Sequence, residues 1–101
     1  MIIYSVTVTI DAKMETEWTT WMREVHIPDV MKTGYFEHSH FQRLLEPKPE
    51  KGLATYNVQY ECISMENYQA YQKNEAFRLQ QAHTERYKDR FAAFRTLLER
   101  I

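Results

Sequence analysis

The sequence contains very little glycine, proline or cysteine: two glycines, three prolines and one cysteine among 101 residues. A loop that wraps a nucleotide phosphate needs several closely spaced glycines, so a nucleotide site of that kind is excluded. A lone cysteine, Cys62, cannot form an intrachain disulfide, which fits a reducing compartment. We expect Cys62 to be a small buried hydrophobic residue, because a nucleophilic thiol needs an activating base or cation that the sequence does not show.

Long hydrophobic runs and an excess of one charge are also missing. No apolar stretch approaches the roughly 20 residues that span a membrane, and the opening MIIYSVTVTI has no basic segment of the kind that begins a signal peptide. The 13 Lys and Arg residues are interspersed with 14 Asp and Glu residues, for a formal charge of −1. Nucleic-acid binding needs a clustered positive field. We therefore expect a cytoplasmic protein that binds neither membranes nor nucleic acids.

The chain does have enough apolar material for one core. Hydrophobic residues make up 44% of it and aromatic residues 14%, and a length of 101 residues is typical of a single domain, here spanning 1–101. Seven tyrosines and two tryptophans join large apolar surfaces to polar tips. Such residues suit a wall where a core meets water.

Alternation of apolar and polar residues predicts three strands, at 2–10, 35–46 and 53–62. The segment 47–52 holds two prolines and a glycine and is expected to be the loop between the last two. One face of the first and third strands is polar without being strongly charged. Its residues are Ser5, Thr7, Thr9, Asn57, Gln59 and Glu61.

Apolar residues spaced three and four apart predict a first helix over 13–25. Pro28 is expected to interrupt or restart it, because proline lacks the backbone donor and biases Ile27 away from helical angles. A short turn would then run to Lys32. Gly34 is placed to end that turn in the left-handed conformation.

A second helical region is predicted over 64–88, with a break near Asn74. The tail 90–101 fits either a helix or a strand, and its local propensity favours a helix. Topology favours a strand, because the preceding order β-α-β-β-α is completed by a fourth strand into a ferredoxin-like unit. We therefore predict an α+β protomer with a four-stranded antiparallel sheet.

Both helices of such a unit cover one face of the sheet and leave the other bare. Here the bare face would carry the polar strand residues together with apolar ones such as Ile3 and Leu53. A second copy of the chain would cover it face to face and enclose a partly polar lumen between the two sheets. Twofold assembly is the commonest oligomer geometry, so we expect a homodimeric α+β barrel.

Four stretches carry a resemblance to a known family: MIIYSVTVTID, HIPDVMKTGYF, TYNVQYEC and RFAAFRTLLE. Together with the order of elements, they resemble an uncharacterised bacterial family of dimeric α+β-barrel domains, the domain-of-unknown-function family DUF4286. The resemblance covers nearly the whole chain and implies a ferredoxin-like protomer, a barrel-type homodimer and a final strand. It brings no established activity or catalytic residues. The wider superfamily resembles cofactor-free monooxygenases, lactone isomerases, haem-degrading enzymes and stress-response dimers, many of which use the lumen as their pocket.

His26 and Glu61 are the candidates for proton transfer. His26 lies at the edge of the first helical stripe, where it can face a cleft, and a histidine can act as a general base near neutral pH. The alternative is a histidine that bonds the carbonyl freed by Pro28 or simply faces water. Glu61 lies on the polar strand face as an acid or base, or as a hydrogen-bonding group in a dimer interface.

The candidates for ligand binding are Trp21, Asn57, Gln59 and Arg95. Asn57 and Gln59 share a strand face with Glu61. Arg95 would pair with Glu61 if the last strand lies nearby, or hold a carboxylate substrate. Trp21 would form a flat pocket wall, although core packing also explains it.

The other histidines have structural explanations. His38 and His40 share a strand face, but zinc usually needs three or four ligands, so no metal site is predicted. His83 lies on a helical stripe as a core histidine. No cofactor is expected.

The leading hypothesis is a homodimeric barrel that binds a small organic molecule in a lumen lined by His26, Gln59 and Glu61. If it is an enzyme, cofactor-free acid–base or monooxygenase-type chemistry is expected. The alternative is a non-catalytic dimerisation or regulatory module whose polar lumen is only an interface. The sequence leaves open which of the two applies.

Overall fold

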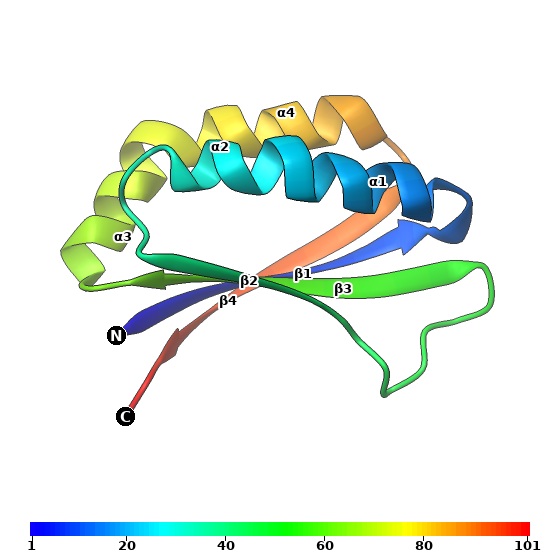
Figure 1. Cartoon of the computed structure of the whole chain (residues 1–101), viewed down its shortest axis with the longest axis horizontal. Helices are drawn as coiled ribbons and strands as arrows, with labels where there is room; N and C mark the ends of the chain where they lie inside the picture. Colours follow the sequence, from blue (N-terminus) through cyan, green and yellow to red (C-terminus); the bar gives the residue numbers. More distant parts are fainter.

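The computed structural model describes all 101 residues as a four-stranded antiparallel sheet with two helical regions on one of its faces (Figure 1). The strands are β1 (Ile2–Asp11), β2 (His38–Arg43), β3 (Leu53–Cys62) and β4 (Phe91–Glu99). They lie in the order β2-β3-β1-β4, and every neighbouring pair is antiparallel. The element order is the predicted β-α-β-β-α-β, and the tail forms the predicted final strand.

The first helical region continues through Pro28 without interruption. It consists of a 3₁₀ turn (Ala12–Met14), α1 (Glu15–Trp21), a π-helical turn (Met22–His26) and α2 (Ile27–Met31). The predicted interruption at Pro28 is wrong, and so is the expected bias of Ile27, whose φ of −61° and ψ of −45° are helical. The expected short helical turn is present as α2, which has Pro28 in its first turn and is capped by Lys32. The N–H of Ile27 donates to the carbonyl of Met22, five residues back. The missing N–H of Pro28 therefore falls where the hydrogen bonding changes from π to α, a site at which a helix tolerates proline.

The π-helical turn also changes which residues face the sheet. Met22 and Ile27 are buried, whereas Val25, which a regular α-helix places on the same stripe as Met22, is 42% exposed. A π turn inserts one extra residue, so the spacing between buried residues becomes five. His26, the last residue of this turn, lies against Trp21 and against His83 of the second helical region.

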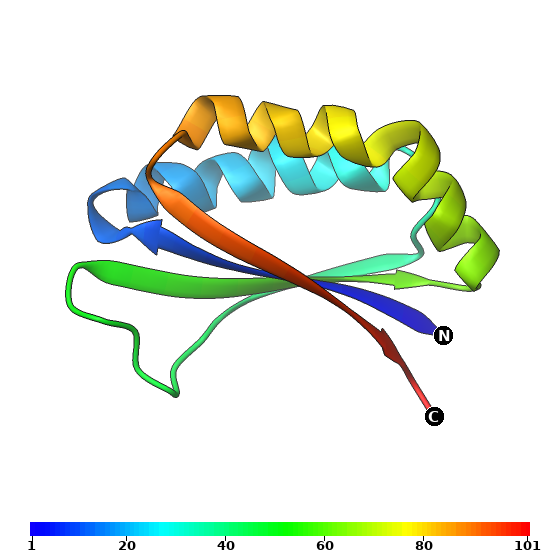
Figure 2. The same cartoon turned by 180° about the vertical axis from the view of Figure 1, so that it is seen from behind.

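The second helical region also contains a π-helical turn. It consists of α3 (Met65–Tyr71), a π-helical turn (Gln72–Ala76) and α4 (Phe77–Tyr87). The π-helical turn lies where the sequence predicts a break, and the ribbon changes direction there (Figure 2). Tyr71 and Ala76, five residues apart, are both buried.

The second strand is shorter than predicted: β2 covers only six residues of the expected segment 35–46. Gly34 has a φ of +82°, which is the left-handed conformation expected of it. Phe36 is buried before the strand begins. The residues leading into β2 thus serve the core rather than the sheet.

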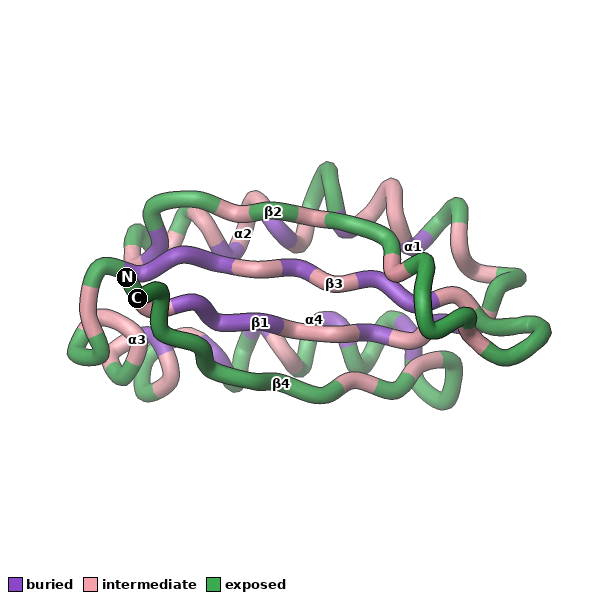
Figure 3. Tube along the Cα trace, turned by 90° about the horizontal axis from the view of Figure 1, so that it is seen from below, coloured by how far each residue is buried: buried purple, intermediate pink, exposed green.

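The two faces of the sheet differ in composition. On the helix-covered face, β1 and β3 supply an apolar and aromatic surface that belongs to the core: Tyr4, Val8, Ile10, Tyr56, Val58, Tyr60 and Cys62. The open face is seen in Figure 3, where the two central strands are mostly buried or half-buried and the outer strands largely exposed. Pairing of Thr7 with Asn57 and with Phe94 fixes those three residues on this open face.

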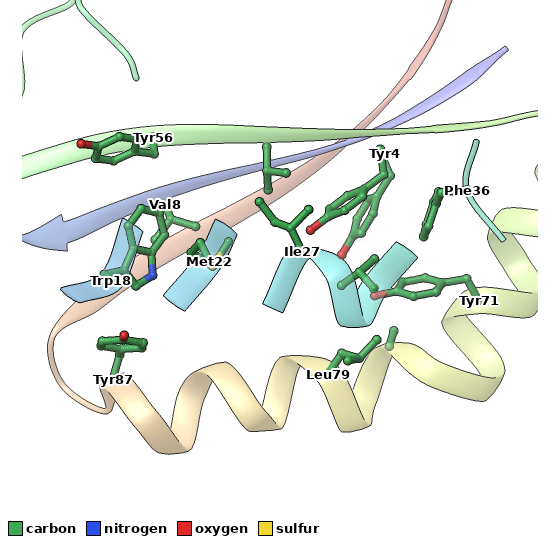
Figure 4. Packing of buried hydrophobic residues seen from close by; sticks show 14 of the residues in the cluster. Tyr4, Val8, Trp18, Met22, Ile27, Phe36, Tyr56, Tyr71, Leu79 and Tyr87 are labelled. Carbon is green, nitrogen blue, oxygen red and sulfur yellow. The ribbon is translucent and has the colours of Figure 1, made fainter. Parts of the chain in front are cut away.

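Trp18 joins the two helical regions above the sheet. It is fully buried, and its indole N–H donates to Nε2 of His83 on α4 over 2.9 Å. Figure 4 shows Trp18 packed between Val8 of the sheet and Tyr87 of α4. Trp18 is therefore a core residue, as is Cys62, whose thiol donates to the carbonyls of Tyr35 and Ser64.

We expect Ile27→Ala to lower the free energy of unfolding by about 2–4 kcal/mol, because it removes a buried side chain and leaves a cavity. Val25→Ala should change it by no more than about 0.5 kcal/mol, since the side chain is exposed. Urea unfolding followed by circular dichroism measures both. The reverse ranking would mean that the helix continues through this segment without the π-helical turn.

Candidate functional site

A small cavity lies between the helices and the sheet. Its walls come from β1, β3 and β4 below, and from the first helical region, α3 and α4 above. The space open to the centre of a water-sized molecule is about 40 Å³, enough for about three water molecules. Most of the lining is apolar, and the polar groups are Tyr4, His26, Tyr60, Tyr71, Gln80, His83 and Arg95.

His26 enters this cavity from the end of the π-helical turn. Its ring stacks on that of Trp21, with 4.9 Å between centroids and 23° between planes. Burial lowers the pKa of His26 to about 4, and the charge of Arg95 lowers it further against the opposing effect of Asp29. The imidazole is therefore neutral at pH 7. It makes no hydrogen bond within the chain, so neither of its nitrogens is committed to a structural role.

His83 faces His26 across the cavity, with 5.7 Å between ring centroids. Its Nε2 accepts the hydrogen bond from Trp18, which places the proton of the neutral ring on Nδ1. Burial lowers the pKa of His83 to about 4, with smaller contributions from His26 and Arg95. The core position predicted for His83 is confirmed, and the same residue also forms part of the cavity wall.

Arg95 supplies the only charged side chain of the lining. It lies on β4, paired with Val6 of β1, and therefore on the helix-covered face. The side chain is exposed at the edge of the sheet, and no hydrogen bond or ion pair within the chain occupies its guanidinium group. Its charge reaches the interior, since it lowers the pKa of both His26 and His83.

Tyrosine hydroxyl groups complete the polar part of the lining. Figure 4 shows the hydroxyl groups of Tyr4 and Tyr71 directed into the same space between sheet and helices. Gln80 approaches the hydroxyl of Tyr4 at 3.5 Å. Burial raises the pKa of both Tyr60 and Tyr71. These hydroxyl groups therefore stay protonated and can donate hydrogen bonds to an acceptor.

The open face of the sheet holds a separate polar network. Glu61 is buried by its neighbours; its carboxylate accepts from His40 at 2.9 Å and from Arg100 at 3.2 Å, and these two partners lower its pKa, Arg100 more than His40. Asn57 donates to the hydroxyls of Ser5 and Thr7. The polar groups of this face are thus largely bonded to one another.

The structure does not bring the predicted site residues together. Trp21, His26 and Arg95 lie on the helix-covered side, and Asn57, Gln59 and Glu61 lie on the open face. The physical reason is the strand pleat, which sends alternate side chains to opposite faces. Arg95 does not pair with Glu61 for the same reason. A single protomer therefore has no lumen lined by His26, Gln59 and Glu61, and Trp21 lies behind His26 rather than in the cavity lining.

Sequence reasoning missed Tyr4, Tyr71, Gln80 and His83 as parts of a cavity. The available signal was the polar tips of residues on core-facing stripes, which need either partners or space within the core. Within the structure, no group of three or more His, Cys, Asp or Glu side chains is arranged to hold a metal ion. None of its helices combines the length and apolar character needed to cross a membrane.

The fold is that of a ferredoxin-like α+β protein. A dimeric ferredoxin-like protein from an uncultured marine organism matches it with a TM-score of 0.70 at 14% identity, covering 100% of this chain and 95% of that chain. An ethyl tert-butyl ether d (EthD) family protein from Bacillus halodurans matches with a TM-score of 0.68 at 12% identity, covering 100% of both. A de novo designed protein, Foldit4, reaches 0.63 at 8% identity, covering 99% of this chain and 98% of that one. Such low identities show the fold alone.

The chain belongs to the family described as Domain of unknown function (DUF4286), whose model matches residues 1–101. A search of curated proteins finds no match. The family and the ferredoxin-like fold expected from the sequence are therefore confirmed.

We expect the free energy of unfolding to fall as the pH is lowered from 7 to 5. His26 and His83 have a folded-state pKa of about 4, so below their ordinary value near 6.5 the unfolded chain binds more protons than the folded one. Stability is then fully present above about pH 6.5 and is lost toward pH 4. Each histidine contributes a slope of at most about 1.4 kcal/mol per pH unit, measurable by urea unfolding at several pH values.

His26→Gln should remove roughly half of this pH dependence. His38→Gln, at an exposed position on β2, is the matched control and should keep all of it. Measurements above pH 5 also exclude most of the titration of Asp11 and Glu61, whose pKa values are lowered by their own partners. A wild-type stability that does not change between pH 7 and pH 5 would contradict the neutral, buried state of the two histidines.

Proposed function

We propose that the protein binds a small organic molecule in the helix–sheet cavity of each protomer. The observation that supports this most is the set of unpartnered polar groups facing one space: the imidazole of His26, the guanidinium of Arg95 and the hydroxyl of Tyr71. No side-chain nitrogen or oxygen that is shut off from water lacks a hydrogen-bond partner, so these free groups are in contact with solvent and are available to a ligand. A ligand supplies their hydrogen bonds, as water does in its absence.

The proposed ligand site is thus the helix–sheet cavity and not the lumen between two sheets that was expected from the sequence. With Glu61 on the opposite face, His26 is left as the candidate for proton transfer at this site. Its pKa of about 4 makes it a weak base at neutral pH, and general-base catalysis is most efficient when the pKa lies near the working pH. The low pKa of His26 therefore favours ligand binding over proton abstraction at this site.

We propose in addition that two protomers pair through their open sheet faces. Apolar side chains remain uncovered there, with Phe94 61% exposed and Leu98 46% exposed. Most polar groups between them, including Asn57 and Glu61, are already bonded within the chain, so a second copy can cover this face and leave few of them unpaired. The neighbour of similar fold from an uncultured marine organism is described as a dimeric ferredoxin-like protein. In this arrangement Asn57, Gln59 and Glu61 are interface residues, and each cavity stays within its own protomer.

A non-catalytic dimerisation module is the second candidate function. The observation in its favour is the volume of the cavity, about 40 Å³, which is far below the roughly 300 Å³ or more of a pocket for a drug-sized ligand. Any ligand must therefore be small. A site that holds only water would leave dimerisation as the function.

Ligand binding is tested by screening small metabolites with NMR of the histidine ring protons. A ligand in the cavity should shift the signals of His26 and His83 in a saturable manner and raise the melting temperature. Ala93→Leu fills part of the cavity from β4 and should weaken binding at least tenfold. Ala82→Leu adds the same atoms at an exposed position on α4 and should not.

Dimerisation is tested by sedimentation of two matched variants. Phe94→Glu puts a charge on the open face and should raise the dimer dissociation constant at least a hundredfold, because a desolvated unpaired carboxylate is costly. Phe77→Glu makes the same change on α4, where Phe77 is 79% exposed, and should leave it unchanged. A wild-type chain that stays monomeric at micromolar concentration, or equal effects of the two variants, would contradict pairing through the open face.

A further inference from the structure

The chemical character of the cavity narrows the kind of molecule that fits it. Arg95 is the only charged residue of the lining, and no Asp or Glu side chain takes part. Four groups of the lining have no hydrogen-bond partner within the chain. They are the hydroxyls of Tyr60 and Tyr71, the imidazole of His26, which donates through one nitrogen and accepts through the other, and the exposed guanidinium of Arg95. A cavity that offers mainly donors, one of them cationic, requires a ligand that accepts hydrogen bonds and carries negative charge.

The apolar part of the lining limits the rest of the ligand. Val6, Val8, Val58, Leu79 and Phe91 surround the polar groups. Inorganic phosphate or sulfate has no apolar portion to place against these walls, whereas a short hydrocarbon chain does. The available space matches about three water molecules, so the chain can hold only a few carbon atoms.

The edge position of Arg95 suits it to hold the charged end of such a ligand. Its guanidinium is solvated while the cavity is empty, and it can turn inward without breaking an existing ion pair, because it has none. Guanidinium groups bind carboxylates through two parallel hydrogen bonds, which fixes the direction of the ligand as well as its charge. The hydrocarbon end would then point toward the valines of the sheet and His26 would lie alongside.

We propose that the ligand is a short-chain organic monocarboxylate, held by Arg95 at the mouth of the cavity with its hydrocarbon end between β1, β3 and α4. This inference rests on the proposed ligand site and goes beyond it by naming the class of ligand and the anchoring residue. It does not depend on any reaction taking place.

The test uses the full-length protein and sodium formate, acetate, propionate and butyrate as probes, at constant ionic strength. Binding is followed by the ring signals of His26 and His83. Affinity should rise about fourfold for each methylene group that fits and fall once the chain exceeds the cavity. Acetamide and propionamide, which match the shape without the charge, should bind at least tenfold more weakly. Phosphate and sulfate should compete poorly.

Three variants test the anchoring residue. Arg95→Gln should weaken carboxylate binding tenfold or more, and Arg95→Lys should recover part of the loss, because it restores the charge but not the paired hydrogen bonds. Arg23→Gln, on an exposed part of the π-helical turn, is the matched control for lost positive charge and should have no effect.

The outcomes separate this inference from the proposed function. If carboxylates and amides bind equally, or if Arg95→Gln leaves carboxylate binding unchanged, the ligand class or its anchor is wrong while the cavity remains a binding site. If phosphate binds as tightly as propionate, the site selects charge alone and the organic carboxylate is rejected. If no small molecule of the wider screen shifts either histidine, the proposed function fails as well.

Discussion

Alternation of side chains along β1 and β3 is the constraint on which the remaining structure depends. One face of these two central strands packs under the helices and forms the floor of the cavity, and the other carries a hydrogen-bonded polar surface. A side chain can serve only one of these faces. Glu61 therefore belongs to a network with His40 and Arg100, while His26 belongs to the cavity. The same constraint gives the molecule two independent surfaces, one enclosed beneath the helices and the other open on the far side of the sheet.

The two π-helical turns determine how the helices fit that sheet. Each inserts one residue beyond the regular α-helical spacing, so that buried side chains lie five apart, at Met22 and Ile27 in one region and at Tyr71 and Ala76 in the other. In the first region Val25 is exposed to solvent, and His26 lies at the end of the turn in the lining of the cavity. π-helical turns are rare within α-helices, and many of those observed lie at functional sites. The buried bond between Trp18 and His83 then holds the two regions at a fixed distance.

The fold was largely predictable from the sequence because its signals are local or topological. Strand alternation identified β1 and β3 closely, and the order of elements identified β4 where local propensity favoured a helix. The continuity of the helical region through Pro28 was not predictable from proline's usual behaviour, because it depends on the π-helical turn that precedes Pro28. The site was only partly predictable. Asn57, Gln59 and Glu61 were correctly assigned to the open face, but His26 was assigned to the same lumen although its helix covers the other face of the sheet. The spacing of single residues does not specify which side chains meet in a cavity between helices and sheet.

The position of β1 in the sheet has a consequence for folding of the chain as it is made. β1 is synthesised first, yet its two neighbours are β3, residues 53–62, and β4, residues 91–99. Contacts so distant in sequence form slowly, because a long loop must close before they stabilise the chain. Until β4 emerges, one edge of β1 has no partner, and a strand rich in Ile, Val and Thr with an open edge is prone to pair with other chains. During synthesis, the chain of this protein therefore passes through a stage in which β1 has one unpaired edge that can associate with other chains.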